Sequence, residues 1–145
     1  MKNATRRLTF TLVFATVLVP CIAFAGVHPG HGCSNATFYG GYGMKLTGTW
    51  PQGAIVDVGR AVADGAGNVS GIDTISLGGA IYADTPFTGT YSVDSTCTLT
   101  ATLNATGLPT VTLNGVIIDG GNGIFMVETD TGTSVSGTAT ATDVH

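Results

Sequence analysis

Polar and apolar residues alternate with a period of two along most of the chain, most clearly over Thr85 to Asn104. One face of this stretch collects apolar side chains and glycine: Phe87, Gly89, Tyr91, Val93, Leu99, Ala101 and Leu103. The opposite face is almost entirely threonine and serine. Such a period is the pleat of a β-strand with one buried face. The stretch therefore predicts two strands joined by a tight turn at residues 94–96.

The same alternation recurs between glycine-rich turns such as Asp64 to Asn68 and Asp119 to Gly123, which favour hairpins. No segment shows a helical period with caps. The pattern predicts eight strands, at 37–50, 54–63, 68–77, 86–94, 97–105, 109–118, 123–129 and 133–142. In the second strand we expect Val56, Val58 and Arg60 to share the buried face. Gly115 predicts a bulge in the sixth.

Short connections predict that neighbouring strands pair in the antiparallel sense. An eight-stranded meander leaves two free edges unless its first and last strands pair. We therefore expect an all-β fold, a closed eight-stranded antiparallel up-and-down barrel over residues 37–142, whose interior is filled or holds one small ligand. A two-sheet β-sandwich is the alternative. A small outer-membrane barrel would need a lipid-facing apolar surface and aromatic girdles, which fit this chain less well.

The N-terminus has the pattern of a secretory signal. Lys2, Arg6 and Arg7 precede an apolar run, and Ala23-Phe24-Ala25 predicts cleavage after residue 25. Lipidation at Cys21 is disfavoured, because a proline precedes it. We expect a secreted or periplasmic protein, with residues 26–36 as a leader that contains glycine and histidine.

Cleavage also changes the charge balance. The processed chain keeps two basic residues, Lys45 and Arg60, and nine acidic residues, so its net charge is 2 − 9 = −7. This acidity argues against nucleic acid as a partner and, with the polar strand faces, against stable membrane insertion after processing. The oligomeric state is not indicated.

Two cysteines, Cys33 and Cys97, remain after cleavage. In an exported chain they most simply form one disulfide, the alternative being two buried thiols. The two positions are 64 residues apart, and chain-entropy arithmetic gives about 4 kcal/mol for such a cross-link.

Two motifs carry a family resemblance: Gly89-Thr90-Tyr91-x-Val93 followed by the turn Asp94-x-x-Cys97, and Gly132-Thr133-x-x-Ser136-Gly137-Thr138-Ala139. They resemble a group of short exported bacterial proteins of unknown function. That group usually follows its cysteine with Thr-Gly-Thr, where this chain has Thr98-Leu99-Thr100. The resemblance implies a β-barrel and no activity. In strand number and glycine content alone, the chain also loosely resembles allene oxide cyclase and dirigent barrels, and no catalytic residue carries over.

The processed N-terminus is a candidate metal site. Gly26, Val27 and His28 would offer an α-amine, two backbone nitrogens and an imidazole, and His31 could assist. Four nitrogens in a plane suit Cu(II) or Ni(II). The alternative is a solvated leader without a metal. Calcium at the acidic glycine turns is disfavoured, because the full ligand spacing is missing.

Three charged residues lie on strand faces that otherwise read as apolar: Arg60, Asp73 and Glu128. If these faces are internal, the charges need partners, and an arginine–carboxylate cluster would supply them. Such a cluster could also bind a ligand or transfer a proton. A bulge that puts the residues at the surface or rim is the alternative. With the cluster, Asp73→Asn should destabilise the fold.

No Ser-His-Asp order, phosphate-binding glycine loop or CxxC motif suggests a catalytic group. We expect a non-catalytic role, either binding of a small apolar or amphipathic ligand or service as a structural or surface module. An enzyme of the cyclase or isomerase type that uses the barrel cavity is the alternative.

Overall fold

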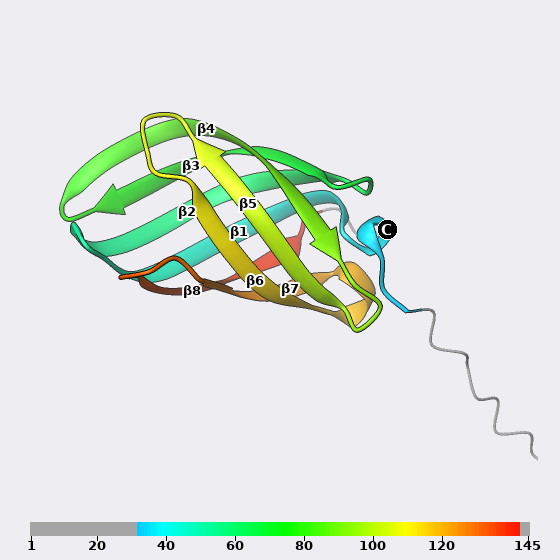
Figure 1. Cartoon of the computed structure of the whole chain (residues 1–145). Coiled ribbons are helices and arrows are strands. Elements are labelled where there is room, and N and C mark those ends of the chain that lie inside the picture. The colour runs from blue at the N-terminus through cyan, green and yellow to red at the C-terminus, as the bar shows by residue number, and fades with distance from the viewer. Residues whose placement is uncertain (1–31, 143–145) are drawn as a thin grey trace, which may run out of the picture.

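Residues 32–142 are described by the computed structural model, and in this range each strand pairs with its neighbours in the sequence (Figure 1). The elements are η1 (Asn35–Thr37), β1 (Tyr39–Trp50), β2 (Gly53–Asp64), β3 (Asn68–Leu77), β4 (Ala80–Val93), β5 (Thr98–Ala105), β6 (Val111–Ile118), η2 (Asp119–Gly121), β7 (Gly123–Glu128) and β8 (Ser134–Ala141). All pairings are antiparallel, and β1 also pairs with β8 from Tyr42↔Ala141 to Thr49↔Ser134. The closed up-and-down barrel is confirmed, and the sandwich is excluded.

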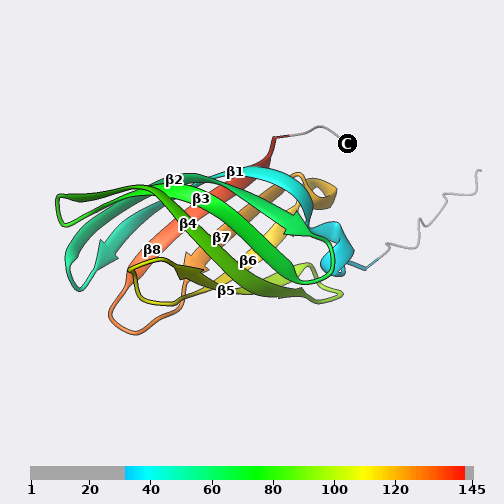
Figure 2. The ribbon, with the colours of Figure 1, turned by 90° about the horizontal axis from the view of Figure 1, so that it is seen from above.

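The barrel has two distinct ends (Figures 1 and 2). We call one the leader end: residues 32–38 and the turns at 65–67, 94–97 and 119–122 lie there. The opposite loop end carries the connections at 51–52, 78–79, 106–110 and 129–133. The expected signal peptide and residues 26–31 lie outside the described range.

The core lies inside the barrel and receives side chains from all eight strands. Buried apolar residues include Tyr42, Leu46, Ile55, Val69, Phe87, Leu99, Leu113, Ile124 and Val135. The outward faces of β4, β5 and β8 carry mainly threonine and serine, in agreement with the predicted alternation. No helix among the described residues is long and apolar enough to cross a membrane.

The expected buried face of β2 is wrong. Val56, Val58 and Arg60 point outward, and Val58 is 49% exposed, whereas Ile55 and Asp57 are buried. The register with β1 explains this orientation, because Asp57 lies opposite the buried Leu46 and residues directly opposite share a face. Both faces of β2 carry apolar side chains, so alternation alone did not identify the inner one.

The expected bulge at Gly115 is also wrong, because β6 keeps its register with β5 and β7. Leu113, Gly115 and Ile117 all stay on the buried face. A register shift occurs instead between Asp73 and Ile75, where β3 pairs with β4. This shift lies near the loop end, and β4 extends there to Ala80, beyond its predicted start at residue 86.

Candidate functional site

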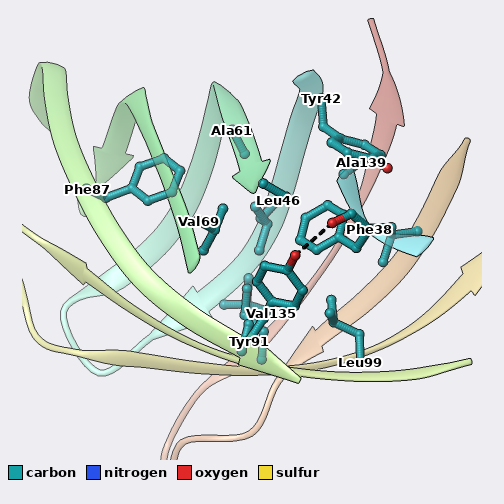
Figure 3. Close-up of a cluster of buried hydrophobic side chains, with 14 of the residues drawn as sticks. Phe38, Tyr42, Leu46, Ala61, Val69, Phe87, Tyr91, Leu99, Val135 and Ala139 are labelled. Carbon is teal, nitrogen blue, oxygen red and sulfur yellow. Dashed lines mark hydrogen bonds between the residues drawn. The ribbon is translucent and has the colours of Figure 1, made fainter. Parts of the chain in front are cut away.

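Aromatic side chains close the leader end. The ring of Phe38 lies 4.7 Å from that of Tyr42 and 4.9 Å from that of Tyr91, centroid to centroid. The Tyr91 hydroxyl lies 2.8 Å from the carbonyl oxygen of Phe38, to which it donates, and Figure 3 shows the two rings together. The Tyr42 hydroxyl donates to the carbonyl oxygen of Gly121 at 2.6 Å. This end of the barrel is therefore packed and tied to its own backbone.

The leader is fixed to the same end by a covalent bond. Cys33 and Cys97 form the expected disulfide, with their Cα atoms 4.9 Å apart. Beside it, Asn35 Oδ1 accepts a hydrogen bond of 2.8 Å from the backbone N–H of Val93. A disulfide of this kind is typical of an oxidising, extracytoplasmic environment.

The loop end is different, because it contains a cavity of about 50 Å³. A site of this size has room for a few water molecules. Its wall is mainly apolar and includes Ile55, Ile75, Phe87, Leu103 and Leu113. Three carboxyl groups also line it, from Asp57 on β2, Asp73 on β3 and Glu128 on β7. We call this space the loop-end cavity.

Asp57 and Asp73 form the polar side of the loop-end cavity, at 8% and 6% exposure. Asp73 lies opposite Gly59, so Asp57 is its diagonal neighbour on the same face. The Oδ1 atoms of both residues are buried and accept no hydrogen bond. Burial, with the nearby Asp73 carboxylate adding to it, raises the pKa of Asp57 to about 7. Burial likewise raises the pKa of Asp73 to about 6.

Glu128 is held by the indole of Trp50, whose Nε1–H donates to Oε2 over 2.8 Å. Burial raises the pKa of Glu128, and the hydrogen bond from Trp50 opposes that effect. Trp50 and Glu128, together with Pro109, also line a groove on the outer surface beside the loop-end cavity. The Trp50–Glu128 pair therefore lies between the cavity and solvent.

A glycine makes room for Asp73. A Cβ atom added at Gly59 would lie 2.6 Å from Asp73 Cβ and 2.7 Å from the carbonyl oxygen of Ile72. Because these neighbours are at or next to the backbone, they cannot move away cheaply. A residue without a side chain at position 59 thus lets Asp73 lie against β2.

Arg60, which we expected to pair with Asp73 and Glu128, is exposed on the outer face of β2 and lines a separate surface groove. The structure therefore brings Asp73 and Glu128 to one cavity and excludes Arg60 from it. Lys45, the other basic side chain in the described range, is exposed too. Without a cationic partner, Asp73→Asn is no longer expected to break a buried ion pair.

Asp57 was missed by the sequence-based prediction. It alternates with Val56 and Val58, whose side of the strand the sequence pattern predicts to be buried. A usable signal was that Ile55, Ala61 and Ala63 form an equally apolar face with Asp57 among them. Only the pairing of β2 with β1 shows which of these two faces is buried.

Metal binding receives no support from the residues at 32–142, among which no group of three or more histidine, cysteine or acidic side chains could hold an ion. Gly26, Val27, His28 and His31 lie outside that range, so the copper or nickel site stays a prediction. The Asp64 carboxylate is occupied by its own turn: Oδ1 accepts from the N–H groups of Ala66, Gly67 and Asn68. The side-chain amide of Asn68 also donates to Oδ2, and this hydrogen bond, together with those from the backbone, lowers the pKa of Asp64 to about 2.

The loop-end cavity offers two carboxyl groups, those of Asp57 and Asp73, that hold their protons up to near-neutral pH beside an apolar wall. Such groups can donate or accept hydrogen bonds to a small guest, and they can carry a proton. No family model matches the chain, and no curated protein or solved structure matches it significantly. The resemblance to short exported bacterial proteins therefore remains a prediction, supported only by the motifs quoted above.

Proposed function

We propose that this protein is an exported, non-catalytic β-barrel that binds a small apolar or amphipathic molecule in its loop-end cavity. The observation that carries the proposal is the contrast between the two ends of the barrel interior. The leader end is packed with aromatic rings, whereas the loop end keeps about 50 Å³ of space between apolar walls and carboxyl groups. Largely apolar sites with a few polar groups are typical of small-molecule binding.

The size of the loop-end cavity limits the occupant to a molecule of a few heavy atoms, or to the end of a longer chain. Leu108 and Pro109, from the β5–β6 connection, line the cavity next to the surface groove. A chain that exceeds the cavity would leave past these residues. The secreted or periplasmic location is part of the proposal and is supported by the disulfide.

The test uses the processed protein and 1-propanol as a neutral probe. Saturable changes in the amide shifts of Ile55, Ile75 and Leu113, together with a change in Trp50 emission, are expected. Ala105→Leu places a larger side chain in the wall of the cavity and should abolish these changes. Ala83→Leu is the matched control, because Ala83 is exposed on β4. Unsaturable or scattered shifts in the wild-type protein, with 1-propanol and with a charged probe of the same size alike, would contradict the proposal.

A structural or surface module is the second candidate, because the leader half of the barrel is filled. That role requires no guest. It would be favoured if native mass spectrometry of the secreted protein shows no retained ligand and the probe titration is flat. The cyclase- or isomerase-type enzyme remains an alternative prediction, without an assigned catalytic residue.

A further inference from the structure

Two buried carboxyl oxygens, on residues that line the loop-end cavity, lack a hydrogen-bond donor. They are Oδ1 of Asp57 and Oδ1 of Asp73. Polar atoms that are buried without a partner cost free energy, so native proteins rarely keep them. A donor that enters the cavity would remove this cost.

The described part of the chain supplies no cationic donor. Three acidic side chains line the cavity, while Lys45 and Arg60 are exposed on the outside of the barrel. The cavity is therefore complementary to a positive charge that comes from another molecule.

We propose that the loop-end cavity binds a small organic ammonium ion, with its N–H groups donating to Asp57 and Asp73 and its short alkyl chain against the apolar wall. This inference rests on the proposed function, since it names the chemical class of the ligand for the same cavity. An ammonium group carries several N–H donors, which suits two neighbouring acceptor oxygens.

A metal ion is a poorer match. Divalent cations that prefer oxygen take about six ligands, and the described residues include no cluster of metal-ligating side chains of sufficient size. The wall, in contrast, offers apolar side chains to an alkyl group. The rings of Trp50 and Phe87 also line the cavity and can attract a cation through their faces.

Ammonium binding should depend on pH. The ionisable groups that face Asp57 are Asp73 on β3 and Glu128 on β7, while β1, β4, β5, β6 and β8 contribute side chains to the lining that do not titrate. At pH 5 both aspartates hold their protons, because burial raises the pKa of Asp57 to about 7 and that of Asp73 to about 6. A cation then has to displace a proton, whereas at pH 8 it meets carboxylates.

The experiment titrates the processed protein with propylammonium chloride and, in parallel, with 1-propanol of nearly the same shape. Calorimetry and the amide shifts of Ile55, Ile75 and Leu113 give both affinities. Propylammonium should bind at least about tenfold more tightly at pH 8 than at pH 5, since each pH unit below a pKa weakens binding to the ionised form roughly tenfold. The affinity for 1-propanol should change little.

Asp57→Asn and Asp73→Asn remove one charge each and keep the shape. Each should weaken propylammonium binding at pH 8 by roughly ten- to a hundredfold, the range for hydrogen bonds to charged groups. Asp84→Asn, on the exposed part of β4, is the control and should leave the affinity unchanged.

The outcomes separate the two proposals. If propylammonium and 1-propanol bind alike at both pH values, or if the aspartate variants bind propylammonium as the wild type does, the ammonium inference is overturned and the small-ligand cavity stands. If neither probe gives saturable shifts at the cavity residues, the proposed function itself fails.

Discussion

The indole N–H of Trp50 donates to the Glu128 carboxylate over 2.8 Å, joining the end of β1 to the end of β7 beside the loop-end cavity. Trp50 is the single tryptophan of the chain, so its fluorescence reports on this site alone. The pair therefore gives an optical measure of the cavity without a label.

Glu128→Gln should remove the part of the pH dependence of Trp50 emission that comes from the carboxyl group hydrogen-bonded to the indole, and leave the part that comes from Asp57 and Asp73 in the same cavity. In the wild type the carboxyl group beside the indole ionises above its ordinary pH range, because burial raises its pKa. Glutamine keeps a carbonyl acceptor for the indole, so stability should change by no more than about 1 kcal/mol. Glu128→Leu leaves the N–H unpaired and should cost about 1–3 kcal/mol. An emission titration in Glu128→Gln that is unchanged from the wild type would contradict the assignment.

The free energy of unfolding should fall as the pH rises from about 4 to about 7. The pKa values of Asp57 and Asp73 are about 7 and about 6 in the fold, against an ordinary 3.8, so the folded state holds these protons more tightly than the unfolded chain. Their contribution to the free energy of unfolding is complete below pH 3.8, and it is lost as the pH rises through the pKa values of the folded state.

Asp57→Asn should therefore raise the free energy of unfolding by roughly 2–4 kcal/mol at pH 8 and change the free energy of unfolding little at pH 4. Urea unfolding at the two pH values measures this difference. Asp84→Asn serves as the exposed control. A variant that is destabilised at pH 8 would mean that a cationic partner compensates the charge after all.

Replacing both disulfide cysteines, Cys33→Ser with Cys97→Ser, should lower the free energy of unfolding by about 4 kcal/mol at most. The bridge joins positions 64 residues apart, so its loss gives the unfolded chain considerable freedom. The measurement is urea unfolding with and without a reductant. The reductant should shift the wild type toward the variant and leave the variant unchanged.

Tyr91→Phe should loosen the leader end. It removes the hydroxyl that donates to the Phe38 carbonyl oxygen and lies 3.2 Å from that of Asn35. We expect a loss of about 1 kcal/mol and faster amide exchange at Phe38. Tyr82→Phe is the control, because Tyr82 is 37% exposed on β4. Equal exchange in both variants would show that the hydroxyl does not hold the leader.

Gly59→Ala should destabilise the barrel by about 1–3 kcal/mol, the range for overpacking a well-packed interior. The added Cβ would lie 2.6 Å from that of Asp73. Gly43→Ala is the control, because a Cβ there meets nothing closer than 3.7 Å. Thermal unfolding compares the two, and equal melting temperatures would show that β2 and β3 can separate at this point.

The alternation of polar and apolar residues, interrupted by glycine-rich turns, was enough to predict the strands, their antiparallel order and the buried faces of most of them. Asp73 shares a strand face with Ile75, and Glu128 shares one with Ile124 and Met126, so the register that buries the apolar side chains also takes the acids inside. The disulfide followed from two cysteines remaining after the expected signal peptide.

Which residues line the loop-end cavity depends on how the strands pair and could not be predicted from the sequence. β2 has apolar residues on both faces, so the alternation along the strand does not show which face is buried. The pairing with β1 places Asp57 inside the barrel and Arg60 outside. The cavity itself depends on how side chains from all eight strands share the interior volume. That volume is set by contacts between residues far apart in the sequence, and no local pattern of hydrophobic and polar positions encodes it.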